Sequence, residues 1–176
     1  MNRRLDPLLW LVLIGGMGLL MPHLPVVLIP LVVSALVWRR LHEVRSWPLP
    51  PRWLLLGFAL TSALLVLAQF HAFWGRDAGV ALLLLAAGLK LLETRDARDH
   101  HSVFLLTFFL LVSVLLFDQA PLVFALVSLL FWFLVGAWIG VSQPQPLPIG
   151  QRMRHAGRLL IAGLPFALIL FALFPR

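Results

Sequence analysis

The sequence predicts an all-α protein, a polytopic bundle of transmembrane helices with seven spans. Of its 176 residues, 61% are hydrophobic and only 12% are charged. About a quarter of the residues in a typical soluble domain are charged. The mean hydropathy is +0.98, and the charged residues fall between long apolar stretches. Together these features predict one membrane domain over residues 1–176.

Seven apolar stretches are candidate spans, because a helix needs about 20 mostly apolar residues to cross a bilayer. Somewhat fewer suffice when flanking side chains reach the interface. The first stretch has a basic flank like that of a signal peptide, but no small-residue cleavage site follows, so we expect an uncleaved span. The first two spans are joined only by Pro22–Pro25. We expect these two helices to be tilted or to form a tight hairpin. The expected spans are 7–21, 25–38, 53–70, 78–92, 103–117, 121–141 and 157–174.

The positions of arginine and lysine predict the orientation of the chain. With the N-terminus in the cytoplasm and a crossing at each span, all but Arg76 and Arg176 of the 14 basic residues are cytoplasmic. Span 78–92 is the weakest, although Lys90 can reach the cytoplasmic interface from its end. Without that span the count is six and the charge bias is weaker. We therefore favour seven spans, with the C-terminus outside the cytoplasm.

Composition also excludes several functions. The chain has no cysteine, so it has no disulfide, thiolate metal site or cysteine nucleophile. No acidic or basic residue and no histidine lies in the middle of a span, which argues against intramembrane catalysis and proton-coupled transport. The net charge of +7 is explained by basic residues that lie between the spans and orient them in the membrane. It does not indicate nucleic-acid binding, because the chain has no polar face on which nucleic acid could bind. We expect no catalytic residue, cofactor or metal in this chain.

Two charged groups flank span 78–92. At its outer end, Arg76 and Asp77 are interpreted as an ion pair at a helix N-terminus, where a carboxylate is favourable; the alternative is a polar site at the outer membrane face. At its inner end, charges of alternating sign predict a salt-bridged helical hairpin to the next span. The alternative there is a metal site, for which Asp96 and His100 have a suitable spacing of four residues. The inner group is Glu93, Arg95, Asp96, Arg98, Asp99, His100 and His101.

Two pairs of glycines have the four-residue spacing that lets helices approach closely. They are Gly136 with Gly140, inside a span, and Gly75 with Gly79, at the edge of one. We expect ordinary packing within the bundle at both pairs, and we do not favour a dimer interface.

The stretch WGRDAGVALLLLAAGLKLLETRDARD, Trp74–Asp99, resembles a signature in the N-terminal membrane region of bacterial TgpA-type transglutaminase-like proteins. Leu173–Arg176 resembles the segment by which those proteins leave the membrane for the periplasm. The resemblance covers essentially the whole chain. The signature residues are Gly75, Arg76, Asp77, Lys90, Glu93, Arg95 and Asp99.

The resemblance implies a multi-pass protein of the bacterial inner membrane, followed beyond Arg176 by a periplasmic transglutaminase-like domain with a Cys-His-Asp triad. None of the triad can be assigned here, since the chain lacks cysteine. The predicted function is a membrane-anchoring and presenting domain of a TgpA-like periplasmic transglutaminase, inactive by itself. Its expected partners are the lipid bilayer and that catalytic domain. The alternative is a binding or transport module for a lipid-linked or envelope substrate, with Arg76 and Asp77 at its outer mouth.

Overall fold

Every regular element in the described part of the chain is a helix. The computed structural model describes residues 5–71, 75–94, 97–143 and 147–173, and the all-α prediction is confirmed for them. Two short 3₁₀ turns, η1 (Met21–His23) and η2 (Val26–Leu28), form the tight connection expected between the first two helices. The α-helices are α1 (Pro7–Leu20), α2 (Ile29–Arg45), α3 (Arg52–Phe70), α4 (Arg76–Glu93), α5 (Ala97–Phe117), α6 (Pro121–Ser142) and α7 (Ile149–Leu173).

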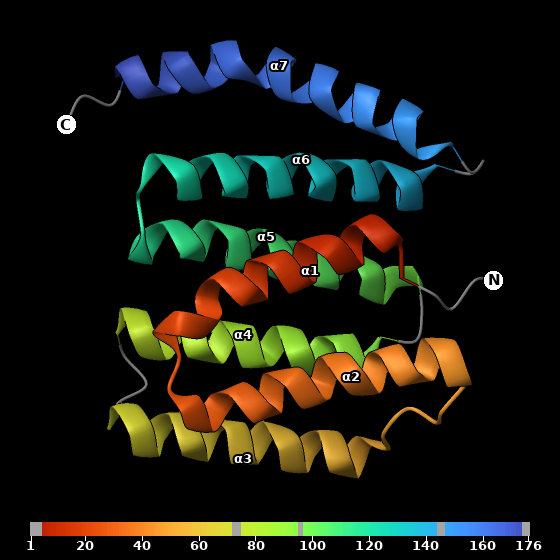
Figure 1. Ribbon diagram of the computed structural model, residues 1–176, viewed down its shortest axis with the longest axis vertical. Coiled ribbons are helices and arrows are strands. Elements are labelled where there is room, and N and C mark those ends of the chain that lie inside the picture. Colours follow the sequence, from red (N-terminus) through yellow and green to blue (C-terminus); the bar gives the residue numbers. More distant parts are fainter. Residues whose placement is uncertain (1–4, 72–74, 95–96, 144–146, 174–176) are drawn as a thin grey trace.

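The helices lie side by side and alternate in direction along the chain. Helices α3 to α7 form a row in chain order, and α1 and α2 pack across one face of that row (Figure 1). The bundle therefore has two ends. The Glu43 end holds the start of α1 and the α2–α3, α4–α5 and α6–α7 connections. The Arg76 end holds the α1–α2, α3–α4 and α5–α6 connections and the end of α7.

Three of the described helices are long and apolar enough to cross a membrane. They are α3, the part of α5 from residue 99 onward, and α6; α1 is apolar but shorter. Several helices extend beyond the expected spans, because the charged residues that ended those spans continue the helix. Thus α5 begins at Ala97 instead of 103, α7 begins at Ile149 instead of 157, and α2 continues to Arg45.

Helix α4, the weakest expected span, lies at the centre of the bundle. It packs against α2, α3 and α5, and Ala81, Leu84 and Leu91 on it are fully buried. A Cβ added at Gly88 would lie 3.3 Å from the Cβ of Ala35, so α2 and α4 approach closely there. The small side of α4 at Gly88 thus permits this close packing.

Helices α3 and α7, at the two edges of the row, carry much of the exposed apolar surface. Exposed apolar patches of this extent mark contact with a membrane or another protein. Helix α7 packs against α6 and contains Pro165, a residue that membrane helices tolerate. The exposed side chains include Leu54, Leu56, Leu60 and Leu64 on α3 and Leu159, Ile161, Leu164, Phe166, Leu168 and Ile169 on α7.

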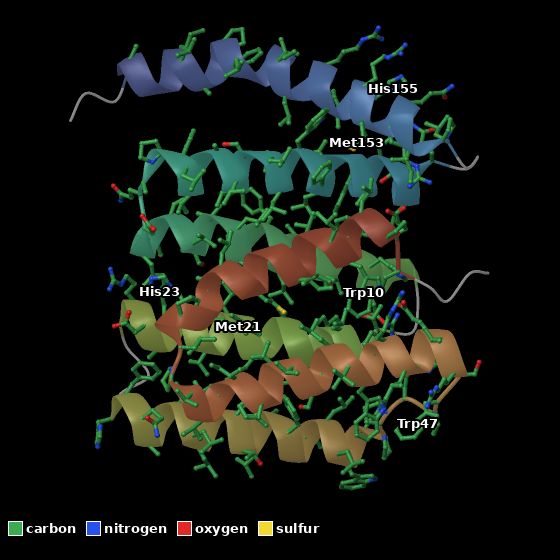
Figure 2. The ribbon with its side chains drawn as sticks, viewed as in Figure 1. Trp10, Met21, His23, Trp47, Met153 and His155 are labelled. Atoms are coloured by element: carbon green, nitrogen blue, oxygen red, sulfur yellow. The ribbon has the colours of Figure 1, made fainter. Side chains whose placement is uncertain are left out.

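The two glycine pairs differ in their surroundings. A Cβ at Gly136 would lie 2.7 Å from Met153 Sδ, and one at Gly140 would meet the guanidinium of Arg152, so this pair brings α6 and α7 together as expected. At Gly75 and Gly79 an added Cβ would meet nothing within 4 Å. The expectation of close packing was therefore wrong for the second pair. Side chains fill the α6–α7 contact around Met153 (Figure 2).

Candidate functional site

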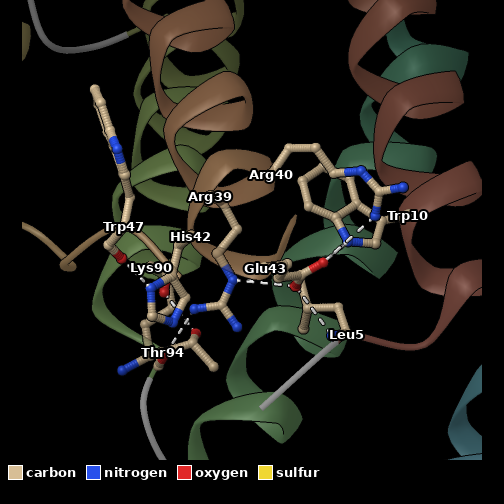
Figure 3. Close-up of polar contacts among 9 residues, drawn as sticks. All are labelled: Leu5, Trp10, Arg39, Arg40, His42, Glu43, Trp47, Lys90 and Thr94. Carbon is tan, nitrogen blue, oxygen red and sulfur yellow. Dashed lines mark hydrogen bonds and ion pairs between the residues drawn. The ribbon is translucent and has the colours of Figure 1, made fainter. Parts of the chain in front are cut away.

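A buried carboxylate organises the Glu43 end. Glu43 lies near the end of α2, and its side chain is 2% exposed. Its oxygens accept hydrogen bonds from the Leu5 backbone N–H at 3.0 Å and from Trp10 Nε1 at 2.8 Å. Figure 3 shows both donors converging on the carboxylate. Glu43 thereby holds Leu5 and α1 against α2.

Arg39 lies one turn before Glu43 and is equally buried. Its Nε is 3.4 Å from Glu43 Oε1. Its Nη1 donates to the carbonyl oxygen of Thr94 at 2.7 Å, while Thr94 Oγ1 donates to the Lys90 carbonyl at 2.6 Å. Thr94 caps the C-terminus of α4, where carbonyls lack helical partners and a cation is favourable. Arg39 therefore joins α2 to α4.

The exposed Arg40 completes this network. Its Nη1 lies 3.6 Å from Glu43 Oε2, and its guanidinium carbon lies 5.7 Å from the centre of the Trp10 ring. A buried ion pair is stable only when additional hydrogen bonds satisfy its charges. Four donors from Leu5, Trp10, Arg39 and Arg40 surround Glu43 and engage both of its carboxylate oxygens. The arrangement suits a structural junction of α1, α2 and α4 better than acid–base catalysis.

The turn between α4 and α5 carries part of the signature. Lys90 Nζ lies 3.1 Å from Glu93 Oε2 and 3.2 Å from Asp99 Oδ1. The second ion pair joins α4 to α5, so the predicted salt-bridged hairpin is confirmed at Glu93 and Asp99, although their cation is Lys90, which was not predicted to take part. Arg95 and Asp96 lie outside the described residues, as does the side chain of Arg98.

The suggested metal site at this turn remains untested, because Asp96, one of its two ligands, is not described. In the ranges that the structure does describe, no cluster of three histidine or acidic side chains could hold a metal ion. His101, which follows on α5, instead packs edge-to-face against Trp138 of α6, with ring centres 5.0 Å apart.

Arg76 organises the opposite end of the bundle. Its Nε lies 3.3 Å from Asp77 Oδ1, which confirms the expected ion pair. Its Nη1 donates to the Leu116 carbonyl at 3.1 Å, and its guanidinium carbon lies 4.6 Å from the Phe117 ring centre. The His23 ring packs on the same phenylalanine. Arg76 therefore links the start of α4 to the end of α5.

Gly75, and not Asp77, occupies the N-cap position of α4. Its φ is +139° and its ψ is 159°, a region that is essentially restricted to glycine. Asp77 lies in the first turn, where its charge favours the helix dipole. The described signature residues thus form two groups, one at each end of α4: Gly75, Arg76 and Asp77, and Lys90, Glu93 and Asp99.

A further ion pair attaches α7. Asp6 accepts a hydrogen bond from the Leu8 N–H at 2.9 Å and so caps α1. Its second oxygen pairs with Arg152 of α7. Trp132 of α6 donates to the Met153 carbonyl at 2.9 Å. The first half of α7 is therefore tied to both α1 and α6.

Sequence reasoning missed both the Arg39–Glu43 network and the Asp6–Arg152 pair. It assigned the two arginines to topology alone and gave the two acids no role. The spacing of four between Arg39 and Glu43 was an available signal, since such residues are neighbours on a helix. No comparable signal relates Asp6 to Arg152, which are far apart in the chain.

The fold and its ion pairs define a class of protein. It is an all-helical domain with apolar helices of the kind found in membranes, and ion pairs join its helices at both ends of the bundle. The chain belongs to the TgpA N-terminal domain family, whose sequence profile matches residues 8–176. It is also similar to a protein-glutamine gamma-glutamyltransferase of Pseudomonas aeruginosa, with 36% identity over 180 residues. The match covers 96% of this chain and 26% of the relative, so the chain spans about a quarter of that protein's length. No solved structure matches.

Proposed function

We propose that this chain is the membrane-anchoring and presenting domain of a TgpA-like periplasmic transglutaminase and that it is inactive by itself. The observation that carries the proposal is that the family match covers nearly the whole chain but only about a quarter of a relative named as a gamma-glutamyltransferase. The partner is then a catalytic domain C-terminal to Arg176. Anchoring confines that domain near the membrane and raises its effective concentration there.

The proposed topology is a single domain over residues 1–176 with seven spans in the bacterial inner membrane. The N-terminus is cytoplasmic and the C-terminus periplasmic. The alternating helix directions support this topology, because they bring the predicted cytoplasmic connections to one end. Basic residues follow the same division. Those described at or near the Glu43 end include Arg39, Arg40, Arg45, Arg52, Lys90, Arg152 and Arg154, whereas Arg76 lies at the other.

A reporter enzyme tests the topology directly. Alkaline phosphatase is active only after export, so a fusion after Arg176 is expected to be active and a fusion at Arg98 inactive. A fusion at Gly75, in the predicted outer connection, provides the matched active control. An inactive Arg176 fusion with equal protein abundance would mean an even number of spans.

An exchange of the membrane domain tests the anchoring function. In the longer protein, residues 1–176 are replaced by an unrelated multi-span domain with the same terminal orientation. An anchor that only confines the enzyme is replaceable, so transglutaminase activity per molecule in membranes should stay within about twofold. Loss of activity at normal abundance would instead favour the binding or transport module.

The Arg76 contacts weaken that alternative. The Arg76 side chain is 55% exposed, but its contacts with Asp77, the Leu116 carbonyl and the Phe117 ring account for its position without a ligand. We therefore assign the Gly75–Asp77 group and the Lys90–Asp99 group to fixing α4 against α5 at both ends. Arg76→Ala in the longer protein distinguishes the two functions. A selective loss of activity at normal abundance would contradict the pure anchor.

A further inference from the structure

An apolar groove opens between α2 and α3 near the Glu43 end. It has a volume of about 200 Å³. Helix α2 contributes Ser34 and Trp38 to its wall, and α3 contributes Leu54 and Phe58. Ser34 and Leu54 are exposed, so the groove opens toward the outside of the bundle. In a bilayer such an opening faces the lipid.

The connector from α2 to α3 closes one end of the groove and is held in place. Trp38 Nε1 donates to the Pro48 carbonyl at 3.2 Å, and His42 Nδ1 contacts the Trp47 carbonyl. Ser46, with φ 55°, ends α2 in a left-handed conformation that turns the chain. Pro50 of the connector lines the groove. The groove is therefore fixed by side chains from α2.

Two exposed arginines flank the connector. Arg45 lies on the same face of α2 as Ser34, because eleven residues make about three turns. Arg52 begins α3, three residues before the groove-lining Leu55. The nearest described acids are already engaged, since Glu43 is buried in its network and Glu93 pairs with Lys90. The end of the groove therefore carries positive charge.

Exposed tryptophans mark the depth of this end in a bilayer. Trp47 in the connector is 51% exposed, and Trp53 at the start of α3 is 84% exposed. Tryptophan is enriched at membrane–water interfaces, at the level of the lipid headgroups. An apolar groove of this size that starts at this level suits the part of an acyl chain next to the headgroup. The open end of the groove would contact the lipid headgroup, and its apolar walls would contact the acyl chain.

We propose that this groove holds an acyl chain of an anionic glycerophospholipid whose phosphate lies against Arg45 and Arg52. Positive charge at the mouth selects an anionic headgroup over a zwitterionic one, and the apolar walls take the hydrocarbon. Basic sites between membrane helices bind anionic headgroups by the same physics. This binding goes beyond the anchoring function, and it requires only that the bundle lies in a bilayer.

Photolabelling tests the proposal on the purified chain in phosphatidylcholine nanodiscs. Each sample contains a trace of phosphatidylglycerol or of phosphatidylcholine with a diazirine in the acyl chain. After irradiation, mass spectrometry measures labelling of residues 29–70 relative to the exposed face of α7, which reports general lipid contact. The phosphatidylglycerol probe is expected to label the groove about 25-fold more than the phosphatidylcholine probe, because each of the two arginines near the surface supplies a factor of about five.

Paired variants separate the headgroup from the chain. Arg52→Gln should lower groove labelling by phosphatidylglycerol about fivefold, whereas Arg154→Gln, an exposed arginine on α7, should leave it unchanged. Ser34→Phe should fill the groove and reduce labelling by both probes. Ser128→Phe, at an exposed serine on α6, is its control. Circular dichroism checks that each variant retains its helices.

Equal groove labelling by the two probes in the unmodified chain would overturn the proposal. So would a loss for Arg154→Gln as large as that for Arg52→Gln, or unchanged labelling in Ser34→Phe. None of these results depends on transglutaminase activity or on the reporter fusions, so failure here is distinguishable from failure of the anchoring proposal.

Discussion

The two ends of the bundle use ion pairs in different surroundings. At the Glu43 end, Arg39 and Glu43 each have side chains 2% exposed and join three helices through backbone and side-chain partners. At the Arg76 end, Arg76 and Asp77 are 55% and 50% exposed. Water screens an exposed pair, whereas a buried pair becomes very costly once one partner is lost. Burial, and not the number of charges, should therefore decide which end governs stability.

The largest expected effect is that of Glu43→Ala. It leaves the Arg39 guanidinium buried without its counter-charge and removes the acceptor for Leu5 and Trp10. The free energy of unfolding should fall by about 3–5 kcal/mol, measured by titration with sodium dodecyl sulfate in mild detergent. The control is the double variant Arg39→Met with Glu43→Leu, which removes both charges and should lose clearly less. If the double variant is as unstable as Glu43→Ala, the unpaired buried charge of Arg39 is not the cause of the lost stability.

A backbone effect should be the largest at the Arg76 end. Gly75→Ala places a Cβ where φ is +139°, and such a conformation costs about 1–3 kcal/mol for other residues. No atom lies near enough to obstruct the new methyl group, so strain alone is tested. The same titration measures the loss. Gly79→Ala, inside α4 and also unobstructed, is the control and should be neutral or slightly stabilising.

An intermediate effect is expected for Lys90→Met. Its ammonium group is partly buried and pairs with both Glu93 and Asp99. Methionine keeps the length of the side chain but loses both ion pairs, so about 1 kcal/mol should be lost. Arg154→Met, at an exposed basic position on α7, should change stability little. If both variants behave alike, the α4–α5 ion pair contributes no measurable stability.

The smallest effect is expected for Arg76→Ala. The pair with Asp77 is half exposed, so solvent screening limits its contribution to about 0–1 kcal/mol. Because salt screens exposed charges, this contribution should shrink further in 1 M NaCl. The Glu43→Ala effect should change little under the same condition. A loss at Arg76 as large as that at Glu43 would remove the distinction between the two ends.

The candidate site was partly predictable from local sequence. Arg76 and Asp77 are adjacent in the chain. Lys90 and Glu93 are three residues apart on one helix, a spacing at which side chains are neighbours. A salt-bridged turn between two antiparallel helices was predicted, but the pairing of Lys90 with Asp99 was not, because Lys90 was expected to reach the membrane interface instead. The contacts of Arg39 with Thr94 and of Glu43 with Trp10 were not predicted, since each joins helices whose lateral order the sequence does not state.

Hydropathy also gave a misleading impression of α4. Its short apolar stretch and flanking charges made it the least certain span, yet it is the most enclosed helix of the row. A helix shielded by neighbours needs small side chains, such as Gly88, more than strong hydrophobicity. The helices that hydropathy identifies best, such as α3 and α6, have the more exposed apolar faces.

The sequence by itself determined the helical class, the approximate helix positions and the division of charge between two ends. These depend on hydrogen bonds within each helix and on local composition, which can be read along the chain. Only the tertiary structure decided which helices are neighbours, that α4 is central, and that Glu43 lies buried among donors from α1 and α2. Those outcomes depend on close packing between residues that are distant in the sequence. The hydropathy of a single sequence does not show which distant residues will pack together.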